Sequence, residues 1–476
     1  MKKLSIRSYK NFIFLSCFSI IISQEPFLEI KPFQQPSFQQ YPASNHVDHH
    51  HPLSNQADDL FLRFDGVEFN NNVIYPDCLT GSSCYDGHAG IDYFMPLNTP
   101  ILAPANGYVL WSSFSSPADP CPGGITPNGD QGTIILAHGN DYFTVYLHMM
   151  PPLNVSVGDN VVTGDTLGFT GNTGCAINSH LHFEVRKGSY FFDSNEPYSV
   201  DPFGWWHNSI DPIEQFRGNR SEWLWVSNSL IDDGDNGFQR FQGPDWTYLS
   251  SGYNNDCWIS PTVNSQEESR HYAIWVPHLE SDGEYNIEVF IPTGLDAVTE
   301  AIYEINIKNE YGISERNTVV VNQNINQGNF NSISSIYIPT GSKCSIILRD
   351  IVGPSSSGSF VVFDAIQFSP ISTNNISEND IILNKDILIK SISPNPFNAR
   401  ANVLYHIPFI ETITFTIIDN IGNEIMQTTT PNHPKGYHNY IWSGKNNLGD
   451  NVSSGIYFFS IASSHERKTK KLVYLK

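Results

Sequence analysis

The stretch Ser179-His180-Leu181-His182-Phe183-Glu184-Val185 decides the fold of the region around it. Polar and apolar side chains alternate through this stretch, and such alternation is typical of a strand with one buried face. In a strand, His180 and His182 lie on one face, about 7 Å apart, while Leu181 and Phe183 point to the core. Other short apolar runs stand between glycine-containing turns, among them Ile134-Ile135-Leu136 and Phe143-Thr144-Val145-Tyr146. The region therefore predicts an all-β domain.

The composition extends this prediction to the rest of the chain. Its 476 residues are enough for about three domains. The 34 glycines, 30 prolines and 13% aromatic residues are typical of β-rich, turn-rich exported domains. A hydrophobic share of 40% excludes disorder for most of the length. The formal charge, 26 − 48 = −22, argues against nucleic acid as a partner, because phosphate binding needs a positive surface.

The N-terminus has the pattern of an export signal. A basic start is followed by an apolar run over 12–22, which is too short to span a bilayer as a helix. We interpret residues 1–23 as a signal peptide cleaved near Ser23-Gln24. A short membrane anchor and a lipoprotein site at Cys17 are the alternatives. We expect no transmembrane segment elsewhere in the chain.

The remaining residues divide by composition. Residues 24–65 are rich in Pro, Gln, Ser and His and predict a linker or pro-segment. We interpret this segment as a solvated polar tail. Its histidines could instead capture a metal or occupy an active site before maturation; they are His46, His49, His50 and His51. Strand-like regions cover 66–210, 220–370 and 389–476, and a polar linker covers 371–388.

The chemistry of the chain concentrates in the 66–210 region. His88 and Asp92 stand four residues apart around a glycine, and His180 and His182 share a strand face. Imidazole and carboxylate ligands without thiolates suit Zn²⁺ with one open coordination position. Zinc lowers the pKa of water bound at such a position toward neutrality, so that this water can attack a carbonyl. Because the chain has sixteen histidines, each fragment alone is a weak signal, and their combination within one β domain is the stronger one.

Residues 86–202 resemble the lysostaphin-like, LytM-type zinc metalloendopeptidases. The resemblance rests on Gly87-His88-Ala89-Gly90-Ile91-Asp92, Tyr146-Leu147-His148, Gly171-Asn172-Thr173-Gly174 and the 179–184 stretch. It implies an antiparallel two-sheet fold with the metal in a groove, and hydrolysis of peptides of peptidoglycan. It implies one zinc per chain held by His88, Asp92 and His182, with His148 and His180 as catalytic residues. A zinc protease for non-wall proteins and a non-enzymatic wall-binding activator are the alternatives, and the filled motif positions weigh against the activator.

Six cysteines remain beyond Cys17, and an even number in an exported chain favours disulfides. Fifteen connectivities are possible, and the domain organisation narrows them to Cys78–Cys84, Cys121–Cys175 and Cys257–Cys344. Two segments depart from the family pattern, an inserted loop over 115–130 and the lead-in at 175–178. Each carries one cysteine near the expected groove, which suggests a Cys121–Cys175 bond that shapes its wall.

The last two regions predict β-sandwich domains. Residues 220–370 resemble the golvesin carboxy-terminal, carbohydrate-binding-like module through 273–277, 283–287, 319–323 and 361–368. Its Trp246, Trp258 and Trp275 could stack on sugar rings, although core positions are the favoured interpretation for each. The acidic run 232–235 lacks EF-hand spacing, so we expect a solvated loop.

The C-terminal region, 389–476, resembles the sorting tail of type IX secretion substrates. The resemblance includes Ser393-Pro394-Asn395-Pro396-Phe397-Asn398 and the closing basic stretch 470–476. It implies contact with that secretion machinery, export across a Gram-negative-type envelope, and a secreted or surface-attached product. From the residues alone, this region is a small Ig-like sandwich.

Overall fold

The computed structural model describes residues 26–34, 41–53, 60–70, 86–117, 121, 126–192, 195–241, 245–266, 268–309, 311–371, 387–393, 395–398, 400–407, 411–433 and 436–475. The predicted signal peptide, Cys78, Cys84 and most of the predicted 371–388 linker lie outside these residues. The chain forms two compact units, Met1–Ile371 and Ser372–Lys476. Among the described elements, only the short helix α1 (Glu214–Arg217) and the 3-10 turn η2 (Tyr253–Asn255) are not strands, which confirms the all-β prediction.

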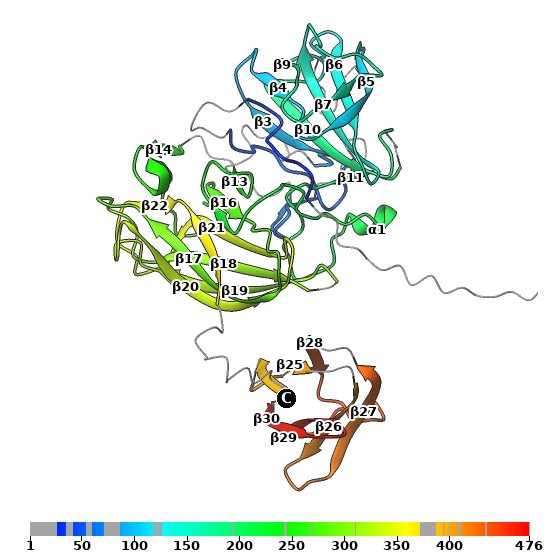
Figure 1. The fold of residues 1–476 in the computed structure, drawn as a ribbon, viewed down its shortest axis with the longest axis vertical. Coiled ribbons are helices and arrows are strands. Elements are labelled where there is room, and N and C mark those ends of the chain that lie inside the picture. Colours follow the sequence, from blue (N-terminus) through cyan, green and yellow to red (C-terminus); the bar gives the residue numbers. More distant parts are fainter. Residues whose placement is uncertain are drawn as a thin grey trace, which may run out of the picture. The chain divides into compact units, whose positions relative to one another are not determined.

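A nine-stranded antiparallel sheet occupies the region predicted to hold the chemistry (Figure 1). Its main path runs β11-β10-β7-β6-β5-β8, while β3 joins β10 and β9 joins both β7 and β4. The strands are β3 (Ile91–Phe94), β4 (Pro100–Leu102), β5 (Gly107–Ser115), β6 (Gln131–Ala137), β7 (Tyr142–Met150), β8 (Asn160–Val161), β9 (Thr166–Thr170), β10 (His180–Lys187) and β11 (Ser199–Val200). Because β10 lies between β3 and β7, three segments far apart in the sequence meet along it.

The apolar face of this sheet follows the alternation in the sequence. Leu181, Phe183 and Val185 of β10 are buried, as are Ile134 and Leu136 of β6. Burial of a side chain of this size stabilises a fold by roughly 1.5–3 kcal/mol. The register of β10 is therefore set firmly, because a slip of one residue would move this apolar set to the buried polar face that carries His180, His182 and Glu184.

The N-terminal segment is part of the fold. Its described residues form β1 (Leu60–Leu62), which pairs with β2 (Glu68–Asn70), and several isolated bridges. The bridges join Leu28 to Trp225, Phe33 to Ile101, Ala43 to Phe241 and Asn45 to Asp92. His46 and His49 are 2% and 0% exposed. The expectation of a solvated polar tail is therefore wrong for 41–53, because buried polar partners from distant segments replace water around it.

The second region, after α1, contains three antiparallel sheets with the orders β12-β23-β17-β20, β13-β16-β21-β18-β19 and β14-β15-β22. The strands are β12 (Leu230–Ile231), β13 (Phe238–Phe241), β14 (Thr247–Leu249), β15 (Cys257–Pro261), β16 (Tyr272–Trp275), β17 (Gly283–Ile291), β18 (Ala301–Lys308), β19 (Ser314–Val321), β20 (Asn329–Ile338), β21 (Cys344–Val352), β22 (Phe360–Phe363) and β23 (Ile366–Pro370). Phe241, Tyr272 and Ile347 of this region pack in one core cluster with Phe64 and Phe203. The two β regions of the first unit are therefore joined by a continuous apolar core.

The burial of Trp246, Trp258 and Trp275 decides whether these side chains are available to stack on sugar rings or belong to the core. Trp258 is 6% exposed and Trp275 is 1% exposed, and both pack in the core of the second region. Trp246 is partly buried and packs against the same core. Core packing is therefore the role of Trp258 and Trp275, and neither presents a ring face to solvent.

Two further expectations about this region need correction. Asp232 and Asp233 are buried while Gly234 and Asp235 are exposed, so the acidic run is solvated only in its second half. Cys257 and Cys344 are free, buried thiols rather than a disulfide. Cys257 begins β15 in the three-stranded sheet, whereas Cys344 begins β21 in the five-stranded sheet and faces Ile307. The two cysteines therefore pack in different core clusters.

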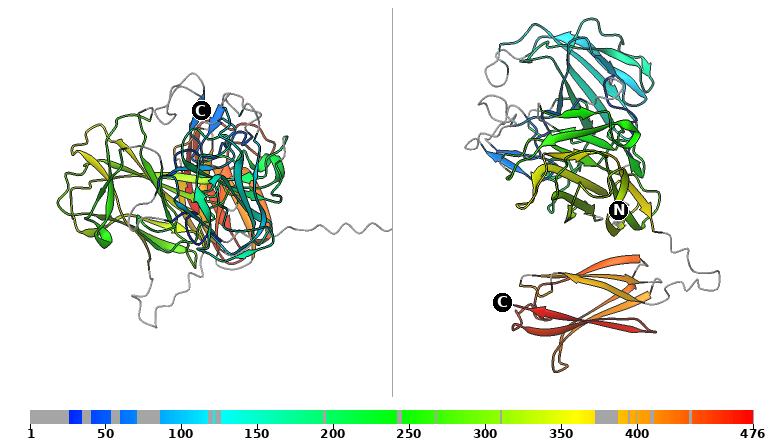
Figure 2. Two further views of the ribbon diagram at one scale, coloured as in Figure 1. Left: turned by 90° about the horizontal axis from the view of Figure 1, so that it is seen from above. Right: turned by 90° about the vertical axis from the view of Figure 1, so that its left-hand side faces the viewer.

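The C-terminal unit consists of two facing sheets, β24-β25-β28 and β27-β26-β29-β30, drawn in orange and red in Figure 2. Its strands are β24 (Leu388–Ser393), β25 (Ala401–Ile407), β26 (Glu411–Asp419), β27 (Glu424–His433), β28 (Gly436–Trp442), β29 (Gly455–Ala462) and β30 (Arg467–Tyr474). Phe415, Trp442 and Phe459 fill the space between the sheets. The unit has the two-layer arrangement predicted for a small β-sandwich.

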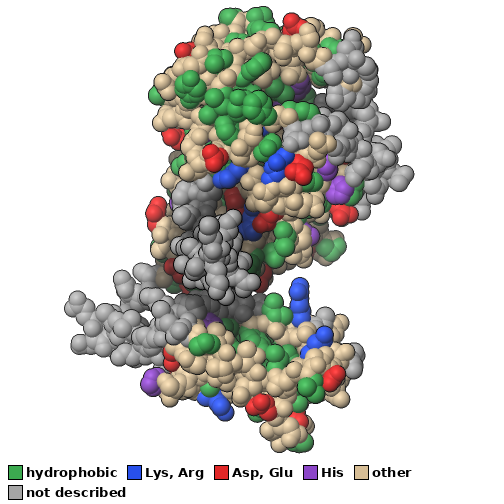
Figure 3. Space-filling model, turned by 90° about the vertical axis from the view of Figure 1, so that its right-hand side faces the viewer, with side chains coloured by type: hydrophobic (Ala, Val, Ile, Leu, Met, Phe, Trp, Pro, Cys, Tyr) green, Lys and Arg blue, Asp and Glu red, His purple; other side chains and the backbone are tan. Residues whose placement is uncertain are grey.

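The surface of the first β region carries exposed apolar side chains. Tyr108 and Trp111 of β5 are 43% and 42% exposed, and Figure 3 shows apolar side chains gathered on one face of this region.

Among the described residues, no helix combines the length and the apolar character needed to cross a bilayer.

Candidate metal centre

Strand β10 brings the candidate residues together through its two neighbours. In the antiparallel pairing with β3, His182 stands opposite Asp92 and His180 stands opposite Phe94. On its other side, His182 stands opposite Leu147 of β7, next to His148. Directly opposed residues in an antiparallel pair point to the same face. The register therefore places Asp92 beside His182, which the sequence spacing alone did not require.

His88, Asp92 and His182 present three donor atoms to one point. His88 Nε2 lies 3.0 Å from His182 Nδ1 and 3.3 Å from Asp92 Oδ1, and His182 Nδ1 lies 3.0 Å from Asp92 Oδ1. All three side chains are buried. Two nitrogens bound to one tetrahedral Zn²⁺ lie about 3.3 Å apart, so this spacing fits the ion. The donor set, two imidazoles and one carboxylate, is also one that zinc prefers.

Gly90 permits this approach. A Cβ atom at this position would lie 2.7 Å from the carbonyl oxygen of Phe183 and 2.8 Å from His182 Nε2. Real Cβ atoms do not come so close to backbone, so any side chain would push the 88–92 segment away from β10. The glycine between the first two candidate ligands is therefore required by packing.

The carboxylate of Asp92 is kept ionised. Burial alone would raise the pKa of Asp92, but the neighbouring His88 and His180 and a hydrogen bond from His182 hold it well below its usual range. Its other oxygen, Oδ2, accepts a hydrogen bond of 2.8 Å from the side-chain amide of Asn45. One carboxylate oxygen thus faces the donor cluster while the N-terminal segment satisfies the other.

The two imidazoles of the cluster are also held from behind. His88 Nδ1 donates to the backbone carbonyl of His46 over 2.7 Å, which leaves Nε2 with its lone pair toward the cluster. His182 Nε2 lies 3.1 Å from Glu184 Oε1, and Arg186 Nε donates to Glu184 Oε2 over 2.5 Å. Such hydrogen bonds determine the tautomer and orientation of a metal-binding histidine.

His148 and His180 stand beside the three donors. Their rings are 4.6 Å apart, and His180 Nε2 lies 3.7 Å from Asp92 Oδ1. Each donates its Nδ1 proton to a backbone carbonyl, that of Thr173 for His148 and that of Asn178 for His180, both over 2.8 Å. Nε2 of each ring is therefore left for chemistry. Burial and the charges of His180 and His182 lower the pKa of His148 to about 3, so its imidazole is neutral and can accept a proton.

A distortion of β7 directs the side chain of His148. The pairing of β6 with β7 skips a residue where Gly132 faces Met149 and Ile134 faces Tyr146, which marks a β-bulge. His148, within the bulge, has a φ of 64°, a left-handed conformation that costs a non-glycine residue of order 1–3 kcal/mol. Bulges of this kind redirect side chains at functional sites. Here the strained residue is one of the two histidines with an available ring nitrogen.

The two loops that depart from the family pattern are joined as predicted. Cys121 and Cys175 form a disulfide with a Cα–Cα distance of 5.5 Å. Next to it, the backbones of Asn128 and Gly174 exchange hydrogen bonds of 2.7 and 3.1 Å. Since Thr173 lies between these contacts and His148, the joined loops position the carbonyl that orients this histidine.

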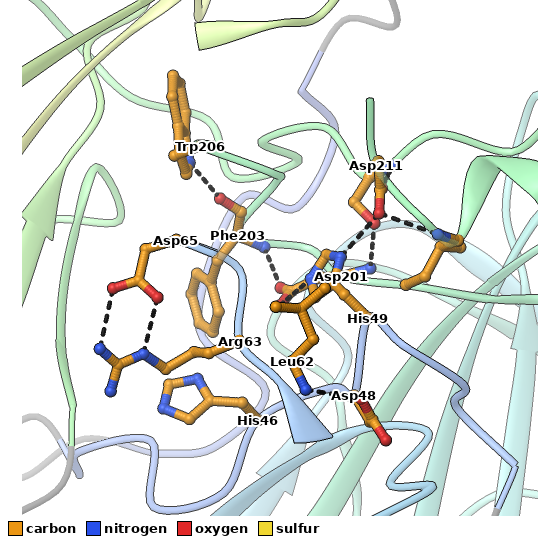
Figure 4. A network of polar contacts seen from close by, with 12 residues as sticks. His46, Asp48, His49, Leu62, Arg63, Asp65, Asp201, Phe203, Trp206 and Asp211 are labelled. Atoms are coloured by element: carbon orange, nitrogen blue, oxygen red, sulfur yellow. Dashed lines mark hydrogen bonds and ion pairs between the residues drawn. The ribbon is translucent and has the colours of Figure 1, made fainter. Parts of the chain in front are cut away.

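The N-terminal segment is part of a buried polar network that the sequence did not indicate (Figure 4). His49 lies between Asp211, 2.8 Å from its Nδ1, and Asp201, 3.2 Å from its Nε2. Burial would lower the pKa of His49, but the two carboxylates raise it to about 9. His46 lies 2.6 Å from the hydroxyl of Tyr272 through Nε2.

Asp48 completes this network. Its carboxylate accepts hydrogen bonds from the backbone N–H groups of His50, Leu62 and Gly87. Gly87 directly precedes His88, so the segment is tied to the first candidate ligand through both backbone and side chain. No histidine of this segment belongs to the His88, Asp92, His182 group. The histidines of this segment thus have a structural role. Their partners, such as Asp201, Asp211 and Tyr272, are distant in sequence, so composition alone could not reveal this role.

Comparison with known proteins assigns the regions to families. Residues 86–196 match Peptidase family M23, residues 229–370 match the Golvesin C-terminal domain, and residues 407–466 match the FlgD Ig-like domain. Among curated proteins, an uncharacterized metalloprotease of Buchnera aphidicola is 38% identical over 133 residues, which are 26% of this chain and 31% of the relative. The peptidoglycan DD-endopeptidase ShyC of Vibrio cholerae is 35% identical over 116 residues, 24% of this chain and 23% of the relative.

Among solved structures, the catalytic domain of lysostaphin from Staphylococcus simulans is 29% identical, with 28% of this chain and 84% of that chain covered and a TM-score of 0.21. The chain spans less than a third of the length of the curated relatives named above. The family matches and the donor cluster agree on the same segment. Residues 86–196 therefore form a domain of peptidase family M23, followed along the chain by a Golvesin C-terminal domain and an FlgD Ig-like domain.

Proposed function

We propose that this protein is a secreted zinc metalloendopeptidase that hydrolyses peptide bonds of peptidoglycan. One zinc ion per chain would be held by His88, Asp92 and His182. The observation that carries the proposal is the convergence of three buried donor atoms within 3.3 Å of one another, inside a segment that matches peptidase family M23. The same donors suit zinc by chemistry as well as by spacing.

The residues of the chain would divide the catalytic work. A zinc ion held by the three ligands would polarise the scissile carbonyl and lower the pKa of bound water. His180, whose Nε2 lies 3.7 Å from Asp92 Oδ1, is placed to take a proton from the attacking water and return it to the leaving amine. His148, neutral and donating its Nδ1 proton to the Thr173 carbonyl, keeps a lone pair at Nε2 and would accept a proton from the attacking water; once protonated there, it would donate to the oxygen that develops charge.

The substrate is proposed from chemistry shared with relatives. Two similar proteins of Vibrio cholerae are named peptidoglycan DD-endopeptidases, and one of Staphylococcus capitis is named a glycyl-glycine endopeptidase. We therefore place the scissile bond in a stem or crosslink peptide. A zinc protease for non-wall proteins is the enzymatic alternative. The non-enzymatic activator is disfavoured because every candidate position is filled.

The other domains support delivery to the wall. Residues 229–370 match a Golvesin C-terminal domain, and we propose that this domain contacts glycan through its surface, since Trp258 and Trp275 are used in its core. We further propose that the signal peptide and the 389–476 region serve export, the latter through the type IX machinery of a Gram-negative-type envelope. The product would then be released or attached at the cell surface.

Digestion of purified peptidoglycan tests the activity. Zinc-loaded protein should release new amino termini from sacculi, and a chelator should stop the release until zinc is restored. Mass analysis of the muropeptides then identifies the bond. A soluble protein such as casein, incubated in parallel, separates the wall enzyme from a general protease.

The His182→Ala variant provides the matched control for the metal. It should lose stoichiometric zinc and all hydrolysis, because one of three donors is removed. Full retention of zinc by this variant would reject the assignment of ligands. Zinc binding without hydrolysis of either substrate by the native protein would favour the activator.

A further inference from the structure

A second group of carboxylates lies in the Golvesin C-terminal domain, away from the peptidase residues. Asp232 and Asp233 follow β12, and Asp256 directly precedes β15. One carboxylate oxygen from each lies within 4.8 Å of the other two. Two oxygens on opposite sides of one Ca²⁺, each at about 2.4 Å, are about 4.8 Å apart, so one ion can reach all three.

Asp233 shows that this group is more than a cluster of surface charges. Its side chain is 2% exposed, and its Oδ2 has no hydrogen-bond donor among the described residues. The Oδ1 atom of Asp256 is likewise buried without a donor there. An unpaired buried carboxylate is costly, because it loses its hydration without replacement. Asp233 and Asp256, which carry these two unpaired oxygens, also have their ligand atoms within 4.8 Å of each other, so one cation could contact both residues.

Asp232 is held in place for such a role. Its Oδ2 accepts a hydrogen bond of 2.7 Å from the side chain of Asn254, and its Oδ1 accepts one of 3.0 Å from the backbone N–H of Asp233. Its own backbone N–H donates to Asp235 over 2.9 Å. The group is thus built on a tight turn braced by η2, with part of its oxygen set satisfied and part left for another partner.

The partner that this group calls for is a cation. Three carboxylates present ligand oxygens to one point, and two buried oxygens of this group, Asp233 Oδ2 and Asp256 Oδ1, receive no donor from the described residues. A bound cation would neutralise such a group and take up these oxygens.

We propose that Asp232, Asp233 and Asp256 bind one Ca²⁺ ion in the Golvesin C-terminal domain. The donors are all oxygens, which Ca²⁺ prefers and which zinc uses less readily than nitrogen or sulfur. The ion joins the end of β12 to the start of β15, two strands of different sheets. This site is independent of the proposed peptidase activity.

Calcium titration of the full-length, zinc-loaded protein tests the site. Isothermal titration calorimetry in calcium-depleted buffer should give one equivalent of Ca²⁺ bound, and thermal unfolding should shift to higher temperature as Ca²⁺ is added. Asp233→Asn and Asp256→Asn should each abolish both responses. Asp245→Asn, which changes an exposed aspartate of the same domain, should keep them. His182→Ala should also bind Ca²⁺ normally, so loss of the peptidase centre and loss of this site are distinguishable.

The sign of the stability change separates a binding site from a structural carboxylate. Without Ca²⁺, Asp233→Asn should melt at or above the temperature of the native protein, because it removes like-charge repulsion. With saturating Ca²⁺, the native protein should be the more stable. Absence of calcium-dependent heat and stabilisation in the native protein would overturn the proposal, as would normal calcium binding by both variants. Selective binding of Mg²⁺ would overturn the assignment of the ion.

Discussion

The side-chain amide of Asn45 donates a hydrogen bond of 2.8 Å to Oδ2 of Asp92, a residue 47 positions later that provides the carboxylate of the proposed zinc site. The backbones of the same two residues also form a bridge. Asn45 acts through Asp92 and is therefore a positioning residue. It leaves Oδ1 directed at the two histidine donors.

Asn45→Ala should weaken zinc binding by about 10–100-fold, because removal of a hydrogen bond behind a ligand has effects of this size. Competition with a chromophoric chelator measures the change. Gln34→Ala, an exposed position in the same segment, is the control and should leave the affinity unaltered. Equal affinities for all three proteins would show that Asp92 is oriented by its strand alone.

The mature protein should retain residues 41–53. Asn45 and the carbonyl of His46 in this segment hydrogen-bond to the proposed ligands Asp92 and His88. Removal of the segment as a pro-segment would leave both ligands without these hydrogen bonds. N-terminal sequencing of the exported protein is expected to place the mature start before residue 41. A mature, active form that begins after residue 53 would contradict this role.

His148→Ala and His180→Ala should retain zinc and lose turnover. The expected loss is of order 10²–10⁴ in rate for each, as for a positioned acid–base group. Hydrolysis of a crosslinked muropeptide, together with metal analysis, measures both properties. His465→Ala, at an exposed position in the C-terminal unit, serves as the control. Near-normal rates in both active-site variants would assign the proton transfers to other groups.

His49 predicts a pH dependence of stability. Its pKa is about 9 in the folded protein against about 6.5 in the unfolded chain. Because the folded pKa is the higher one, its stabilising effect is complete below pH 6.5 and is lost as the pH rises through 9. A shift of this size corresponds to roughly 3 kcal/mol of unfolding free energy.

His49→Gln tests this prediction, since glutamine keeps hydrogen-bonding capacity without the charge. The variant should unfold at a lower temperature than the native protein at pH 6, and the gap should narrow by pH 9. Differential scanning calorimetry over this range measures the effect, with His465→Gln as the control. A gap that widens with pH would mean that His49 is neutral in the folded protein.

The Cys121–Cys175 bond should stabilise the two loops that it joins beside the proposed zinc site, without affecting the metal. A disulfide over a separation of 54 residues typically adds about 2–4 kcal/mol. Cys121→Ser with Cys175→Ser should therefore lower the melting temperature, leave zinc content intact and loosen discrimination among peptide substrates. Mass mapping of non-reduced peptides checks the bond itself. A peptide that links Cys121 to a different cysteine would refute the pairing.

Local pattern was sufficient to predict much of the peptidase region. The alternation from His180 to Val185 depends only on strand geometry, so it correctly placed both histidines on one face and Leu181 and Phe183 in the core. Gly90 was recognisable as part of a motif, and the structure explains it by its contact distance to Phe183.

Tertiary structure alone decided which distant segments meet. The polar segment around His49 was interpreted as solvated, because its partners, Asp201 and Asp211, lie more than 150 residues away and no local pattern announces them. The bulge that turns His148 toward His180 is likewise a property of the paired strands β6 and β7, since a single strand has no register.

The sequence by itself determined the all-β class, the family motifs and the candidate ligands, because these depend on residue type and short spacing. The tertiary structure decided burial, pairing and charge balance. Cys257 and Cys344 remain thiols because they pack in different core clusters, and the carboxylates after β12 and before β15 meet although these strands belong to different sheets. Such properties arise from contacts between segments remote in the chain, and composition carries no record of which segments these are.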